Sequence, residues 1–181
     1  NFADMKAGLD PSFRFTVSRA VYKGILKYMS NRFGSDYVVQ PLPVSHLASE
    51  FESENKISVS WKPVLDPLEP TAVPTGYIVH KRIGNGVFDK GTKVTDLGVD
   101  SGGHIRFWTE IPLGEVVSFK VVAYNDGGMS FPSETVSIGI LHNGQTDSTL
   151  LIVNNFDRIS GPAWYDSGNR AGFDSRIDNG V

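Results

Sequence analysis

The sequence predicts a mainly β chain in which an antiparallel sandwich of seven strands follows an α-helix. Three observations lead to this fold class. Apolar and polar residues alternate in several short segments, as at Ile57, Val59 and Trp61, which is the period of strands with one buried face. Turn residues such as Asn85-Gly86 separate these segments. No helix-length segment separates them, so a parallel βαβ arrangement is not expected.

The expected strands have the short lengths and regular spacing typical of a β-sandwich. The proline-rich stretch 63–74 is interpreted as a connection, because proline cannot donate to a strand ladder. The seven strands are expected near residues 44–51, 57–62, 76–82, 93–98, 104–109, 116–124 and 134–140.

The first segment predicts a helix from Asp10 to about Phe33. Asp10 suits the N-cap, and Pro11 suits the first helical position, where no backbone donor is needed. A single helix cannot bury an apolar face alone, so we expect it to pack on the sandwich, on another chain or on a further domain. Three- and four-residue spacing places on this face Phe13, Val17, Ala20, Val21, Gly24, Ile25 and Tyr28.

Three regions are therefore expected: 1–36, 41–140 and 149–181. An extended linker at 37–43 joins the first two. After a polar stretch, the apolar run 150–153 suits a buried strand, and the rest is rich in Gly, Asn and Asp. We interpret this end as the start of another domain or as a partly ordered tail. Because the chain opens on Asn1 without Met, it is expected to be a segment of a longer polypeptide.

The composition excludes several functional classes. The net charge is −3 and no basic stripe occurs, so nucleic acid is not an expected partner. No run reaches the roughly 18 apolar residues of a membrane-spanning helix. Cysteine is absent, which excludes disulfides and thiol chemistry but leaves the cellular compartment open.

Residues spread through 41–140 carry a family resemblance. They are Ile57, Val59, Trp61, Pro63, Gly76, Tyr77, Val79, Phe119, Val121, Ala123, Asn125, Gly128, Ser130, Pro132 and Ser133. This block resembles fibronectin type III domains, which implies an immunoglobulin-like sandwich. The resemblance implies that Trp61 is the core tryptophan of the second strand and that Asn125, Gly128 and Ser130 form the last loop between strands. The family usually has a corner tyrosine where this chain has Val117, so the tyrosine's hydrogen bond is expected to be missing or replaced.

Two shorter resemblances concern the ends of the chain. The first segment, with Leu9, Asp10, Pro11, Phe13 and the stretch 17–26, is similar to the last helix of zinc-dependent N-acetylmuramoyl-L-alanine amidases. The stretch 151–164 looks like the start of the C-terminal domain in large bacterial proteins of the same layout. Some of those proteins are labelled amidases and others xanthan lyases.

Together the resemblances imply a non-catalytic accessory or spacer module of a secreted bacterial cell-wall hydrolase. The alternative is a carbohydrate- or protein-binding module of a polysaccharide-degrading enzyme. The amidase resemblance implies zinc in the parent, with water activated for amide hydrolysis. No catalytic, cofactor-binding or metal-binding position of the family can be placed in this chain, so whether the parent is an enzyme stays open. Expected partners are neighbouring domains and peptidoglycan or another polysaccharide, in a secreted, periplasmic or cell-surface location.

Two aromatic residues, Trp108 and Tyr124, are the candidate ligand contacts. Aromatic rings can form a platform for stacking sugars. Alternation places Phe107 and Trp108 on opposite faces, so one of them is expected in the core. The competing interpretation is that the outer aromatic packs against a neighbouring domain.

Other polar groups have simpler interpretations. The histidines at 46, 80, 104 and 142 show no metal-ligand spacing, and structural or surface roles are expected. Glu50, Glu52 and Glu54 alternate and are expected on one solvated face rather than in a glycosidase pair. The tail residues Asp174 and Asp178, with neighbouring Asn179, do not match a calcium loop and are expected in turns.

Overall fold

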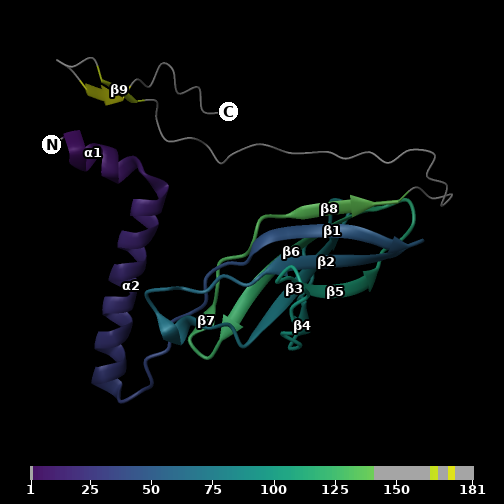
Figure 1. The fold of residues 1–181 in the computed structure, drawn as a ribbon, viewed down its shortest axis with the longest axis horizontal. Coiled ribbons are helices and arrows are strands. Elements are labelled where there is room, and N and C mark those ends of the chain that lie inside the picture. Colours follow the sequence, from purple (N-terminus) through teal and green to yellow (C-terminus); the bar gives the residue numbers. More distant parts are fainter. Residues whose placement is uncertain (1, 141–163, 167–170, 174–181) are drawn as a thin grey trace. The chain divides into compact units, whose positions relative to one another are not determined.

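The computed structural model describes residues 2–140, 164–166 and 171–173, which belong to two compact units. One unit contains helices α1 (Phe2–Leu9) and α2 (Pro11–Phe33) and a short antiparallel pair, β9 (Trp164–Asp166) with β10 (Ala171–Phe173). The other contains strands β1 to β8 (Figure 1). The predicted strand at 150–153 lies outside the described residues.

Helix α2 begins where the sequence predicts, but α1 was not expected. Asp10 separates the two helices. Its Oδ1 accepts hydrogen bonds from the backbone N–H of Ser12 at 2.9 Å and from the Ser12 hydroxyl at 2.7 Å. This is the predicted N-cap, because it satisfies a donor that the first turn leaves free. The hydrogen bond from the Ser12 side chain, together with that from its backbone, lowers the pKa of the Asp10 carboxyl.

The predicted apolar face of α2 is exposed. Phe13, Val17, Val21, Ile25 and Tyr28 follow one another at helical spacing, and each is between 44% and 66% exposed. Within the described part of the chain, neither helix is long and apolar enough to cross a membrane.

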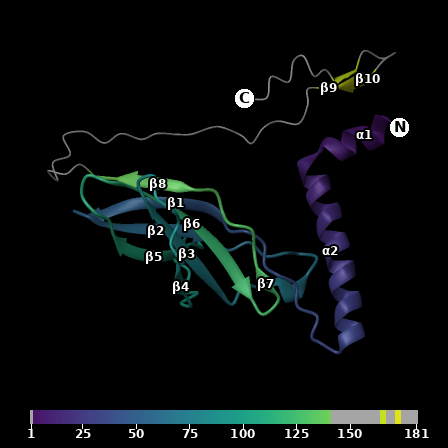
Figure 2. The ribbon, with the colours of Figure 1, turned by 180° about the vertical axis from the view of Figure 1, so that it is seen from behind.

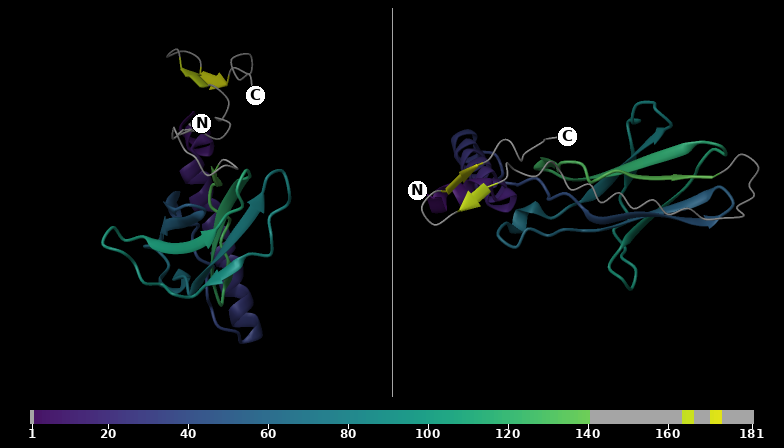
Figure 3. Two further views of the ribbon diagram at one scale, coloured as in Figure 1. Left: turned by 90° about the vertical axis from the view of Figure 1, so that its right-hand side faces the viewer. Right: turned by 90° about the horizontal axis from the view of Figure 1, so that it is seen from above.

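The second unit is a sandwich of two antiparallel sheets (Figures 2 and 3). One sheet has the order β1-β2-β5. The other has the order β4-β3-β6, and the far edge of β6 pairs with both β7 and β8. This arrangement confirms the predicted fibronectin type III-like, immunoglobulin-like sandwich, with one short strand, β7, that was not predicted. The strand bounds are β1 Ser45–Ser53, β2 Lys56–Lys62, β3 Gly76–Ile83, β4 Thr92–Val94, β5 Ile105–Glu110, β6 Val116–Asn125, β7 Gly128–Met129 and β8 Val136–Gly139.

The core lies between the two sheets and is built by alternate residues of the central strands. Trp61 has no exposed surface, as predicted, and its ring lies 5.3 Å from that of Tyr77 on the facing sheet. Val117 is also fully buried in this core. A valine cannot donate the side-chain hydrogen bond of the family's corner tyrosine, so packing replaces that bond here.

Two strands differ in length from the prediction, each for its own local reason. Strand β4 ends at Val94 rather than near 98, and Asp96 Oδ1 accepts a bond from the Gly98 N–H at 3.0 Å. This local turn competes with strand pairing. Strand β8 starts at Val136 rather than 134, beyond Pro132, which has no N–H to donate.

Serine hydroxyls continue the pairing of β6 where backbone pairing is interrupted. The N–H of Ala123 donates to Ser130 Oγ at 3.0 Å, and the N–H of Val121 donates to Ser133 Oγ at 2.9 Å. In return, the N–H groups of the two serines donate to the carbonyls of Ala123 and Val121. The backbone polar groups on this edge of β6 therefore remain satisfied around Pro132.

The segment expected to be a linker, 37–43, is extended but is bound into the sandwich. Val39 has no exposed surface, and its N–H donates to Thr71 Oγ1 at 3.1 Å. The Tyr37 hydroxyl donates to Glu69 Oε2 at 2.9 Å. Asn125 Nδ2 donates to the carbonyls of Val39 at 2.9 Å and Thr71 at 3.1 Å.

Gly127 allows this close approach. A Cβ atom at this position would overlap the Val38 carbonyl, so only glycine fits beside the incoming chain. The sandwich's packing thus begins before residue 41. We call the contacts of Tyr37 and Val39 with Glu69, Thr71 and Asn125 the linker anchor.

Candidate functional site

The outer face of the β1-β2-β5 sheet brings together the side chains most suited to ligand contact. The register places Glu50, Ser58 and Trp108 in one row across the three strands. The next row contains Ser60 and Arg106. Because Ile57 and Val59 point into the core, these alternating neighbours point outward. We call this surface the Trp108 face.

Trp108 is the exposed aromatic of β5. It is 52% exposed, whereas its neighbour Phe107 packs against the core. This confirms that the two residues lie on opposite faces of the strand and that one of them belongs to the core.

Ser58 lies on the central strand of the face, directly across from Trp108. It is 1% exposed, and its Oγ has no hydrogen-bond partner among the described residues. A buried hydroxyl without a partner is unusual and loses the hydration it would have in water.

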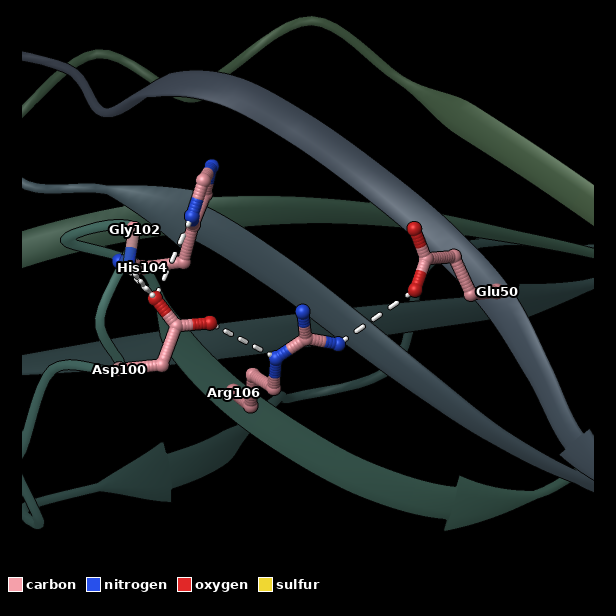
Figure 4. Close-up of polar contacts among 5 residues, drawn as sticks. All are labelled: Glu50, Asp100, Gly102, His104 and Arg106. Atoms are coloured by element: carbon pink, nitrogen blue, oxygen red, sulfur yellow. Dashed lines mark hydrogen bonds and ion pairs between the residues drawn. The ribbon is translucent and has the colours of Figure 1, made fainter.

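The loop before β5 is shaped by Asp100 (Figure 4). Asp100 Oδ1 accepts hydrogen bonds from the N–H groups of Gly102 and His104, each at 2.9 Å. The turn requires the positive φ of Gly103, 79°, and is closed by a 2.9 Å bond from the Gly103 N–H to the Asp100 carbonyl. His104 Nδ1 also lies 3.5 Å from Asp100 Oδ1.

Arg106 connects this loop to β1. Its Nε donates to Asp100 Oδ2 at 3.0 Å, and its Nη1 lies 3.4 Å from Glu50 Oε2 (Figure 4). The His104 N–H, followed by the Arg106 side chain, lowers the pKa of the Asp100 carboxyl. The hydrogen bond that Arg106 donates to Asp100 in turn raises the pKa of Arg106. The guanidinium is thus held in one position between two carboxylates.

This arrangement suits binding better than acid–base chemistry. Both oxygens of Asp100 accept hydrogen bonds, and its lowered pKa keeps it ionised, so it is a poor proton donor near neutral pH. Arg106 stands between Asp100 and Glu50, so these carboxylates do not form a coupled pair. An exposed indole beside a fixed guanidinium and a carboxylate offers stacking and hydrogen bonding.

Tyr124, the other candidate ligand contact, lies on a different sheet. It is on β6, next to the buried Ala123, and therefore faces outward from the opposite side of the sandwich. Its ring covers Gly76, and Lys93 Nζ lies 5.8 Å from the ring centroid. Trp108 and Tyr124 therefore do not form a joint platform, and ligand contact by either residue stays a prediction.

The histidines that the structure describes lie apart. His46 has a positive φ of 53° and contacts Ser45 Oγ at 3.0 Å, while His80 Nδ1 contacts the Asp89 carbonyl at 3.0 Å. In the described ranges, no three His, Cys, Asp or Glu residues could hold a metal ion together. The candidates His142, Asp174, Asp178 and Asn179 lie outside the described residues.

Glu50, Glu52 and Glu54 are all exposed, as expected for solvated side chains, but the expectation that they share one face is wrong. The β1–β2 register shifts between Phe51 and Ser53, and Glu54 has left the strand with a φ of 38°. This irregularity breaks the alternation that the prediction assumed. Only Glu50 joins the Trp108 face.

Asp100, Arg106 and Ser58 were not among the residues predicted from the sequence. The spacing of Asp100 before Gly102 and Gly103 is a turn pattern that indicates a side-chain-capped loop. Arg106 precedes Trp108 by two residues, which places both on the same face of a strand. The contact between Arg106 and Glu50 joins residues 56 positions apart, and no local pattern in the sequence indicates it.

No protein-family model and no curated protein matches the chain. Among solved structures, the chain is similar to the twitchin kinase region from C. elegans, with 21% identity and a TM-score of 0.46, over 59% of this chain and 18% of that one. It is also similar to the FN1–FN3 domains of chicken CNTN1, with 18% identity and a TM-score of 0.45, over 59% of this chain and 34% of that one.

A third similar structure is the extracellular region of rat CD45, domains d3–d4, with 18% identity and a TM-score of 0.42, over 56% of this chain and 51% of that one. The chain therefore spans about a fifth to a half of the length of these structures. Because the TM-scores are low, the fibronectin type III-like fold is established by the strand order and core packing described above.

Proposed function

We propose that this chain supplies a non-catalytic accessory module to a larger secreted cell-wall hydrolase resembling N-acetylmuramoyl-L-alanine amidases. The observation that carries the spacer role is the linker anchor. Helix α2 ends at Phe33, and Tyr37 is already hydrogen-bonded to Glu69 of the sandwich. The chain is therefore bound to the sandwich four residues after the helix ends, which is the short connection expected of a spacer module.

The exposed apolar face of α2 supports the presence of a neighbouring domain. A helix that presents Phe13, Val17, Val21, Ile25 and Tyr28 to solvent gains stability by burying them. In the proposed function this helix closes an amidase-like domain, as the resemblance of 9–26 implies. The expected location, secreted, periplasmic or at the cell surface, belongs to the same proposal.

The Trp108 face supports the non-catalytic part. The Asp100 carboxylate accepts hydrogen bonds from the loop backbone and from Arg106, and these bonds lower its pKa, so it stays ionised. A second candidate function, a binding module of a polysaccharide-degrading enzyme similar to those labelled xanthan lyases, is favoured by the exposure of Trp108.

A zymogram on peptidoglycan tests the proposal. We expect clearing by the whole gene product, its loss with a zinc chelator and its recovery with added zinc. The 181-residue chain alone should give no clearing. Clearing by the chain alone would refute the non-catalytic role.

The same preparations distinguish the two parent enzymes. Failure of the whole product to clear peptidoglycan in a zinc-dependent way would refute the amidase context. Release from an acidic polysaccharide of products that absorb ultraviolet light, through a new carbon–carbon double bond, would favour the lyase alternative.

A further inference from the structure

We propose that the Trp108 face binds an uncharged glycan, with the indole of Trp108 stacking on a sugar ring and Arg106 and Glu50 hydrogen-bonding to its hydroxyls. This inference deepens the proposed accessory role, because it names the ligand class that the module would hold.

Trp108 has the position that stacking needs. Its side chain stands on the outer face of a sheet and is 52% exposed, although it is one of the largest apolar side chains. One face of a pyranose ring presents C–H groups, which are apolar and carry slight positive charge. Such a face complements the negative face of an indole ring.

Arg106 and Glu50 supply fixed polar groups beside the indole. Arg106 lies two residues before Trp108 on the same face, and Glu50 lies in the same row as Trp108. Arg106 Nη2 and Glu50 Oε1 carry no hydrogen bond among the described residues, so a donor and an acceptor remain free. Adjacent sugar hydroxyls can accept from one and donate to the other. Because Arg106 is already held by Asp100, little side-chain entropy is lost on binding.

The charges around Arg106 favour an uncharged ligand. The single guanidinium is flanked by the carboxylates of Asp100 and Glu50. A polyanion would therefore meet a local excess of negative charge, whereas a neutral glycan would meet only hydrogen-bonding groups.

Ser58 provides a second observation that points to a ligand. Its hydroxyl is buried, has no described partner and lies in the row between Glu50 and Trp108. Ser58 lies directly across from Trp108 in the strand pairing, so a sugar hydroxyl that displaces a neighbouring side chain there would satisfy Ser58 Oγ. Binding would then recover a hydrogen bond that the free protein lacks.

An NMR titration of the ¹⁵N-labelled 181-residue chain tests this inference. The backbone amide signals, which every variant retains, and the indole N–H signals of its three tryptophans are followed during addition of chitohexaose or cellohexaose. Trp108→Phe assigns the Trp108 indole signal. We expect a saturable shift of the Trp108 signal with a Kd of about 1 mM, the range of a single stacking site. The buried Trp61 should not respond.

Matched variants give the decisive comparison. Trp108→Ala should weaken binding about tenfold or more, and Ser58→Ala should weaken it several-fold without lowering thermal stability. Leu68→Ala, which removes another exposed apolar side chain outside the Trp108 face, should leave the affinity unchanged. If Trp108→Ala fails to fold, Trp108→Phe and Arg106→Gln provide the comparison.

Several results would overturn the proposal. They are the absence of any shift with both neutral glycans, backbone amide shifts of undiminished affinity in Trp108→Ala, or tighter binding of polygalacturonate than of either neutral glycan. Because the titration uses only this chain, its failure is distinguishable from failure of the parent to hydrolyse peptidoglycan.

Discussion

The side-chain amide of Asn125 donates a 2.9 Å hydrogen bond to the carbonyl of Val39, a residue with no exposed surface. The same Nδ2 lies 3.1 Å from the Thr71 carbonyl and 3.3 Å from that of Val73. Asn125 is the last residue of β6 and pairs with Gly128 of β7, rather than lying in the expected loop, and its side chain joins the incoming chain to the connection between β2 and β3. The Asn125 Oδ1 also accepts from the Gly127 N–H at 2.8 Å, which fixes the orientation of the amide.

Asn125→Ala is expected to lower the free energy of unfolding by about 1–3 kcal/mol, because buried carbonyls lose their donor. Asn125→Asp should lower it further, since a carboxylate would face three carbonyl oxygens. Urea denaturation measures both. Asn85→Ala, at an exposed turn, serves as the control and should change stability by no more than about 0.5 kcal/mol. Equal stability of the Asp variant and the wild type would show that the amide donor is not needed.

Trp61→Ala should cost about 3–5 kcal/mol as a large-to-small change in the core, a large part of the 5–15 kcal/mol typical of a domain. Trp61 Nε1 is buried without a partner among the described residues. Trp61→Phe removes this N–H as well as part of the ring, so its cost should be only about 1–2 kcal/mol. Thermal or urea denaturation compares the two variants, and similar losses for both would contradict the packing described.

Asp100 should make the sandwich more sensitive to acid. Its folded pKa is depressed, first by the His104 N–H and then by Arg106, below the unfolded value of about 3.9. A carboxyl of this kind stabilises the folded state above the unfolded pKa, and the contribution is lost as pH falls toward the folded pKa.

The wild type should therefore have a higher free energy of unfolding than Asp100→Asn. This difference should be largest near neutral pH and should decrease below about pH 4. Urea denaturation across this range provides the measurement. Arg106→Gln should reduce the pH dependence only in part, because the first cause, the His104 N–H, remains. A difference that does not vary with pH would contradict this role of Asp100.

Glu54 occupies the left-handed region with a φ of 38°, at the turn between β1 and β2. Glu54→Gly is expected to raise the free energy of unfolding by about 0.5–1 kcal/mol, because glycine adopts this conformation without strain. Glu52→Gly, within β1, is the matched control and should lower stability by about 0.5–1 kcal/mol. If both substitutions destabilise the protein to the same extent, backbone strain at Glu54 is not the cause.

The sequence by itself determined the periods of the elements and several of their ends. Alternation identified the strands around Trp61, Tyr77 and Phe119 and their inward faces, and Asp10 with Pro11 marked the start of α2. Such patterns are local, because a strand's buried face repeats every second residue and a cap needs only its own first turn. They also separated Phe107 from Trp108 correctly.

Only the tertiary structure determined which residues from distant parts of the chain are neighbours. Arg106 contacts Glu50 because β1, β2 and β5 pair in one sheet. Trp108 and Tyr124 are separated because they belong to different sheets. The chain before β1 is held by a hydrogen bond from Asn125. Sheet partners are chosen by contacts between residues far apart in the chain, and these contacts leave no periodic pattern in either segment. For the same reason, the β1 irregularity that separates Glu54 from Glu50 was visible only once the register with β2 was known.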